Sequence, residues 1–167
     1  GASKLAGEGY CSAYNKSFGI DTVMLRFGNV YGPGSLHKSS VVAKFIRQAL
    51  DGEVLELFGD GSQTRDFIYI DDLIDALILS SVVSGIGGEA FQIASGMETT
   101  VGEMTSNLVK VMQEYGVSNI KVVNGNNRLG DVKRNYSDTS KAKQILNWQP
   151  KVSQKEGLIK TVEYFVK

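Results

Sequence analysis

The chain alternates between runs of helical and of strand-like hydrophobic spacing, and glycines separate many of these runs. Apolar residues recur with the helical period over residues 3–18, 41–50, 73–83, 101–115 and 154–166. Short β-prone runs stand at residues 22–27, 54–58, 66–70, 89–94 and 120–123. Helices that alternate with short strands in this way are typical of an α/β fold.

Residues at the ends of these runs predict where the helices begin and end. Gly19 follows the first helix as a C-cap, and Asp71 or Asp72 is placed to N-cap the helix over 73–83. Residues 99–103, T-T-V-G-E, resemble a capping box. A short helix ending at Leu146 would be capped by Asp138 or Ser140. Gly28 to Ser35 predicts a turn-rich loop directly after a strand, where ligand contacts are common.

Composition narrows the possible classes of protein. The 167 residues are 42% hydrophobic and 22% charged, which suits one globular domain or one domain with part of another. The formal net charge of zero excludes a global basic field for nucleic acid or anionic lipid, so any anion site must be local. The most apolar stretch, Phe67 to Val83, contains three aspartates and predicts no membrane span.

The reactive residue types are few. Cys11 has no partner for an intramolecular disulfide, and His37 has none for a histidine zinc site, so a reducing cytoplasm is the expected compartment. Asp71 and Asp72 at a strand-to-helix junction are interpreted as helix caps, and we predict no metal. No G-x-G-x-x-G pattern occurs on a strand-to-helix turn.

Two arginines beside glycine-containing turns are the best candidates for chemistry. The forked guanidinium groups of Arg65 and Arg128 suit the oxygens of a diphosphate. The ordinary alternative is an ion pair, Arg65 with Asp66 or Arg128 with Asp131. Asn29 follows a strand and could donate to a phosphate or a hydroxyl, although asparagine before a turn is often only conformational.

Four motifs together resemble one family over nearly the whole chain. They are S-K-L-A-G-E (Ser3 to Glu8), L-R-F-G-N-V-Y-G-P (Leu25 to Pro33), F-G-D-G-S-Q-T-R-D-F-I-Y-I-D-D-L (Phe58 to Leu73), and R-L-G-D-V (Arg128 to Val132) with D-T-S-K-A (Asp138 to Ala142). In this order they resemble the extended short-chain dehydrogenase/reductases, that is, the NAD-dependent epimerase/dehydratase family. The form of the third motif is most similar to UDP-glucose 4-epimerase relatives.

The resemblance implies a fold and a division of the chain. The fold would be the C-terminal part of a doubly wound, NAD(P)-binding Rossmann-like fold plus a small mixed α/β substrate-binding lobe. Residues 1–35 would be a remnant of the dinucleotide-binding domain. Residues 36–167 would be mainly the nucleotide-sugar lobe, with interleaved Rossmann elements.

The resemblance also implies cofactor-binding and catalytic residues. Lys4 would bind the nicotinamide ribose hydroxyls of NAD and lower the pKa of the catalytic tyrosine, and Phe27 and Gly28 would lie near the nicotinamide. That tyrosine would stand one position before Gly1, and the family's nucleotide-binding glycines and catalytic serine or threonine would also lie upstream. The chain therefore looks like the C-terminal portion of an enzyme, inactive alone.

The substrate residues implied by the resemblance are Asn29, Leu57, Phe58, Arg65, Arg128 and Asp131. The arginines would clasp the diphosphate of a nucleotide sugar with the help of Asn29. Leu57 and Phe58 would lie beside the base, and Asp131 near the ribose.

The complete enzyme would pass a hydride from carbon 4 of the sugar to NAD and form a 4-keto sugar, as an epimerase does. A 4,6-dehydratase, a decarboxylase or a non-catalytic nucleotide-sugar-binding module are the alternatives. A homodimer through the helix over 3–18 is expected for the complete enzyme. The chain alone should expose apolar surface and self-associate.

Overall fold

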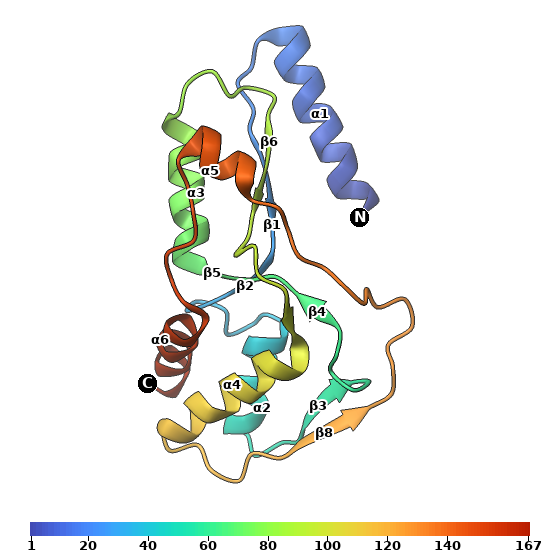
Figure 1. Cartoon of the computed structure of the whole chain (residues 1–167), viewed down its shortest axis with the longest axis vertical. Coiled ribbons are helices and arrows are strands. Elements are labelled where there is room, and N and C mark those ends of the chain that lie inside the picture. Colours follow the sequence, from blue (N-terminus) through green and yellow to red (C-terminus); the bar gives the residue numbers. More distant parts are fainter.

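The computed structural model describes residues 1–167, and its elements follow the predicted alternation (Figure 1). The helices are α1 (Ala2–Phe18), α2 (Val41–Leu50), α3 (Ile70–Val82), α4 (Val101–Glu114), α5 (Ser140–Leu146) and α6 (Gln154–Val166). The strands are β1 (Met24–Phe27), β2 (Asn29–Tyr31), β3 (Leu55–Phe58), β4 (Thr64–Arg65), β5 (Phe67–Tyr69), β6 (Ala90–Ile93), β7 (Thr99–Thr100) and β8 (Val122–Gly125). Every predicted helix is present, with ends shifted by no more than a few residues.

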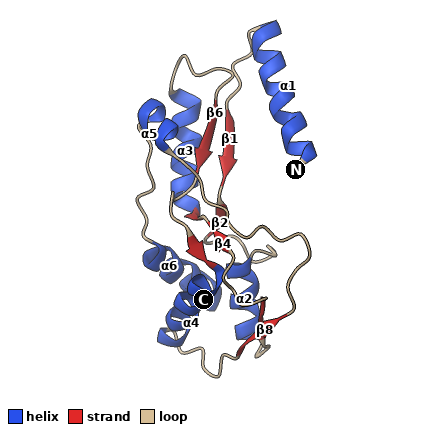
Figure 2. Ribbon diagram, turned by 45° about the vertical axis from the view of Figure 1, so that its right-hand side comes forward, coloured by secondary structure: helices blue, strands red, loops and turns tan.

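The strands pair two by two rather than in one continuous sheet. The pairs β1–β6, β2–β5 and β3–β8 are parallel, and β4–β7 is antiparallel. The molecule is elongated, with β1, β6, α1, α3 and α5 toward one end and β3, β8, α2 and α4 toward the other (Figure 1). Helices α1 and α3 lie on opposite sides of the β1–β6 pair (Figure 2).

Two hydrophobic cores meet at β5. Phe67 and Tyr69 belong to the larger core, which packs α2, α4 and α6 against β3. Ile68, between them, belongs to the smaller core formed with α3, α5 and β6. This strand therefore serves both cores, because successive side chains of a strand point to opposite faces. Trp148 is fully buried in the smaller core and donates its indole N–H to the carbonyl of Asp72 at 2.9 Å.

Two sequence predictions about this region need correction. The segment from Gly28 to Ser35 is not only loop, because Asn29–Tyr31 form β2 against β5. Asp71 and Asp72 are not N-caps either, since α3 begins at Ile70 and places both in its first turn. The buried carboxylate of Asp72 instead accepts the backbone N–H groups of residues 151 and 152, at 2.9 and 3.2 Å.

The capping residues predicted for α4, α1 and α5 can be compared with those in the structure. The capping box at α4 is confirmed in its main contact, because Thr100 accepts the N–H of Glu103 at 3.0 Å. Gly19 adopts the left-handed conformation that ends α1, with φ of 65°. At α5 the N-cap residue is Thr139, while Asp138 accepts the N–H of Ser140 at 2.8 Å.

Apolar side chains are exposed around the β1–β6 pair, as expected from the sequence. Helix α1 buries no residue, and Leu5 and Phe18 are each about 70% exposed. On α3, Ile78 and Val82 are also mostly exposed. Strand β1 pairs only with β6, so its other edge is open. No helix combines the length and the hydropathy that crossing a membrane requires.

Candidate functional site

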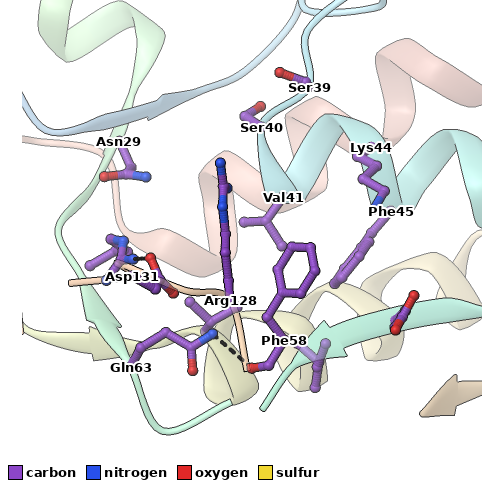
Figure 3. A pocket seen from close by; sticks show the side chains of 14 residues that line it. Asn29, Ser39, Ser40, Val41, Lys44, Phe45, Phe58, Gln63, Arg128 and Asp131 are labelled. Carbon is purple, nitrogen blue, oxygen red and sulfur yellow. Dashed lines mark hydrogen bonds and ion pairs between the residues drawn. The ribbon is translucent and has the colours of Figure 1, made fainter. Parts of the chain in front are cut away.

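One cleft of about 550 Å³ collects the predicted substrate residues from distant parts of the chain (Figure 3). Its lining includes all six of them, namely Asn29, Leu57, Phe58, Arg65, Arg128 and Asp131. They come from β2, β3, β4 and the segment between β8 and α5. The structure thus brings together residues that lie about a hundred positions apart in the sequence.

Asn29 is positioned by a close approach of two backbones. The preceding Gly28 has no room for a side chain, because a Cβ there would lie 2.8 Å from the carbonyl oxygen of Asp66. The N–H of Asn29 donates to that same oxygen at 2.6 Å. Strand β2 therefore begins directly beside the residue that follows Arg65.

The guanidinium of Arg65 is held by three acceptors. Its Nη1 donates to the carbonyls of Thr64 and Val132 at 2.7 and 2.6 Å, and its Nη2 donates to Asp131 at 2.5 Å. The ion pairs considered as the alternative in the sequence, Arg65 with Asp66 and Arg128 with Asp131, are not formed. Arg65 pairs with Asp131 instead, and its remaining N–H groups are available to a ligand.

Arg128 and Lys44 flank the exposed ring of Phe58. The guanidinium carbon of Arg128 and the Nζ of Lys44 each lie 5.9 Å from the ring centroid, within the range of a cation–π interaction. Neither cation takes part in an ion pair within the chain, so both keep charge available in the cleft. Glu56 adds a carboxylate to the lining.

The first turn of α2 also faces the cleft. Ser39, Ser40 and Val41 line it, and Ser40 is the N-cap of the helix without making a side-chain cap. Its Oγ is buried without a hydrogen-bond partner. The first N–H groups of a helix have no partner inside the helix, and its dipole attracts anions. Together with the nearby cations, this end of α2 makes the cleft suited to a phosphate group.

Sequence reasoning missed Ser40 and Lys44. A serine before a helical run is a signal for an N-cap, and so Ser40 could have been singled out. Lys44 gave no signal, because a lysine on an amphipathic helix is ordinarily a solvated residue. Only the packing of α2 beside β3 brings it to Phe58.

The predicted cofactor residues lie outside this cleft. Phe27 lines a neighbouring cleft of about 590 Å³, which shares Ser39 and Ser40 with the first. Lys4 is exposed in the first turn of α1 and lines neither cleft. No cluster of histidine, cysteine, aspartate and glutamate suited to a metal ion is present.

Comparison with known proteins decides the family. Residues 1–94 match the model of the NAD dependent epimerase/dehydratase family. The chain belongs to this family. The family is NAD-dependent, which agrees with the cofactor expected from the sequence.

Individual members of the epimerase/dehydratase family match nearly the whole chain. A UDP-glucose 4-epimerase of Mycolicibacterium smegmatis is 36% identical over 166 residues, which are 98% of this chain and 51% of that protein. The crystal structure of a Thermotoga maritima UDP-glucose 4-epimerase with UDP-glucose is 37% identical with a TM-score of 0.90, covering 99% of this chain and 52% of that one.

A third relative carries the cofactor. The Bacillus cereus UDP-glucuronic acid 4-epimerase, in complex with UDP-glucuronic acid and NAD, is 32% identical with a TM-score of 0.88. The match covers 99% of this chain and 51% of that one. The chain therefore spans about half the length of the relatives that it matches.

Proposed function

We propose that this chain is the nucleotide-sugar-binding portion of an enzyme similar to UDP-glucose 4-epimerase. The observation that carries the proposal is the convergence of six predicted substrate residues on one cleft that also contains unpaired cations. The likeness to epimerases of known structure supports the same class of substrate.

The cleft offers a partner for each part of a UDP-sugar. Arg128 would bind the diphosphate with its free fork, assisted by the remaining donors of Arg65 and by the N-terminus of α2. Asn29 would donate its amide N–H to the same group. The ring of Phe58, 42% exposed, would stack on the base, and Asp131 would accept a hydrogen bond from a ribose hydroxyl.

The chain would also contribute one wall of an NAD site. Phe27 is half-exposed at the C-terminal end of β1, so its ring is accessible to a bound nicotinamide, and Gly28 directly follows it. Lys4 would hold ribose hydroxyls by hydrogen bonds. Bound NAD would supply hydride transfer at carbon 4 of the sugar. The tyrosine that Lys4 would assist is not among these residues, so we expect no turnover by this chain alone.

The exposed apolar side chains support a further dinucleotide-binding part. The open edge of β1, together with α1 and α3, offers strand pairing and apolar contact to such a part. Residues 1–35 would then belong to that domain and residues 36–167 mainly to the substrate lobe. We also propose that the complete enzyme is a homodimer that uses α1.

The proposal is tested by calorimetric titration of the chain with UDP, with uridine as the comparison. UDP should bind much more tightly than uridine, because the diphosphate meets the cations of the cleft. Arg128→Ala should weaken UDP binding by about 1.5–3 kcal/mol, the usual cost of losing a hydrogen bond to a charged group. Arg26→Ala is the matched control, since Arg26 pairs with Glu8 on the surface outside the cleft. Equal affinity for UDP and uridine would overturn the proposed substrate.

A non-catalytic module is the alternative, and it is favoured by a cleft built wholly within this chain. Such a module would bind UDP and show no NAD-dependent turnover even in the complete protein. An assay of the complete protein on UDP-glucose with NAD therefore separates the two functions.

A further inference from the structure

The carboxylate of Asp66 lies buried behind the cleft without lining it. Asp66 is 2% exposed and lies between Arg65, which ends β4, and Phe67, which begins β5. No ion pair includes this carboxylate. Burying a charged group is costly unless hydrogen bonds compensate for the lost water, so hydrogen bonds must stabilise it here. The hydrogen-bond donors that surround the carboxylate of Asp66 therefore indicate its role.

Four donors converge on this carboxylate from two other segments. Oδ1 accepts the N–H of Ser95 at 2.7 Å and its hydroxyl at 2.6 Å. Oδ2 accepts the N–H of Gly96 at 3.0 Å and the N–H of Ser137 at 3.2 Å. Asp66 thus joins the turn after β6 to the segment before α5.

Ser137 lies in the segment that carries two of the cleft residues. We name residues 126–139, between β8 and α5, the arm; it includes Arg128 and Asp131. Elsewhere the arm is fastened over residues 131–135. Arg65 donates to Asp131 and to the carbonyl of Val132, Thr64 bonds to residues 133 and 135, and Arg134 forms an ion pair with Glu98. The Ser137 contact is its attachment nearest to α5.

Asp66 also organises the strand side of the cleft. Its main-chain carbonyl accepts the N–H of Asn29, and its peptide neighbour is Arg65. One residue therefore connects the segments that bear Asn29, Arg65, Arg128 and Asp131.

We propose that Asp66 is a positioning residue that sets the arrangement of the anion-binding groups without touching the ligand. This inference rests on the proposed binding of a nucleoside diphosphate. The side chain holds the arm through Ser137, and the main chain holds Asn29, so that cations from the arm and from β4 face the same ligand.

Asparagine at this position provides a sharp test, because it is nearly identical in size and cannot accept all four hydrogen bonds. Whichever way its amide is turned, the NH2 group faces N–H donors. The longer bonds to Oδ2 are the weaker pair, so the NH2 group should take that side and release Gly96 and Ser137. Asp66→Asn should therefore loosen the arm.

Asp72→Asn is the matched control. Asp72 is also 2% exposed and also accepts two backbone N–H groups, but these belong to residues 151 and 152, far along the chain from the cleft residues. Both variants should lower the melting temperature. Only Asp66→Asn should change the arm and the cleft.

The experiment measures amide hydrogen exchange over residues 126–139 and UDP affinity by calorimetry in the two variants. An unpaired buried donor costs enough to change either quantity by roughly 5- to 150-fold. Asp66→Asn should raise arm exchange and weaken UDP binding within this range, while Asp72→Asn should leave both at the values of the unmodified chain. Unchanged arm exchange in Asp66→Asn, or equal effects in the two variants, would overturn the proposal.

Two results would leave UDP affinity uninformative about Asp66: failure of the unmodified chain to bind UDP, and failure of Asp66→Asn to fold. If the unmodified chain does not bind UDP, the proposed function fails, while arm exchange still decides the role of Asp66. If Asp66→Asn does not fold, Ser137→Pro removes the donor from the arm side and leaves the carboxylate intact. Faster arm exchange in Ser137→Pro supports the positioning role, and unchanged exchange refutes it.

Discussion

Replacing Arg65 with lysine preserves the positive charge in the cleft and removes the planar fork. In the structure the fork spans three acceptors, the carbonyls of Thr64 and Val132 and the carboxylate of Asp131. A lysine places its donors on one nitrogen at the end of a flexible stem. We expect that nitrogen to keep Asp131 and to lose the two carbonyls.

The size of the effect follows from these contacts. Two hydrogen bonds from a charged donor contribute about 3–6 kcal/mol if both are fully shielded from water. The side chains of Arg65 and Asp131 are 15% and 28% exposed, so water can replace part of what is lost. We therefore expect Arg65→Lys to lower the free energy of unfolding by about 2 kcal/mol.

Urea denaturation measures this loss directly. With a slope of about 2 kcal/mol per molar urea, the midpoint should fall by about 1 M. Arg26→Lys is the control, because Arg26 also contacts a carboxylate with two nitrogens, but on the exposed surface with Glu8. Its midpoint should not move measurably. Equal midpoints for the two variants would refute the assignment of Arg65 as a partly buried fork that docks the arm.

Two further predictions concern the arm and the larger core. Arg134 donates to Glu98 and lowers the pKa of that carboxyl to about 2, from its ordinary value of 4.5. The folded state therefore binds fewer protons than the unfolded state, and stability should fall as the pH drops from 4.5 to 2. Melting curves should show this slope, and Glu98→Gln should flatten it. Gly157→Ala should lower the free energy of unfolding by about 1–3 kcal/mol in urea denaturation, because a Cβ would lie 2.5 Å from the hydroxyl of Tyr31. Gly7→Ala is the control: a Cβ there meets no atom within 4 Å, so on exposed α1 it should raise the free energy of unfolding by about 0.5–1 kcal/mol. A stabilising Gly157→Ala would contradict the packing of α6 in the larger core.

The sequence predicts the helices well because each carries its own local signal. The run from Val41 to Leu50 buries five residues on one face, and its helical spacing is visible without any knowledge of the partner. Strands β2, β4 and β7 were not predicted as separate elements. Each has only two or three residues, which is too short to show an alternating period, and each exists because a distant strand lies beside it.

The residues of the candidate site also fall into two groups: those that sequence motifs identify, and those whose contacts arise only from the fold. The motif resemblance identified Arg65, Arg128 and Asp131, and the structure places all three in one cleft. It did not identify the partner of Arg65, because Asp66 is its neighbour in sequence whereas Asp131 is its neighbour in space. Lys44 reaches the cleft only through the packing of α2, which no local pattern encodes.

Arg65 and Arg128 therefore have different roles in the cleft. Arg65 is already bound to the arm and fixes its position relative to β4, whereas Arg128 is on the arm and its guanidinium makes no hydrogen bond or ion pair within the chain. A ligand held by both arginines connects the arm to the strands. Because such coupling is reciprocal, any ligand that requires an ordered arm must also order it, and UDP should slow amide exchange over residues 126–139.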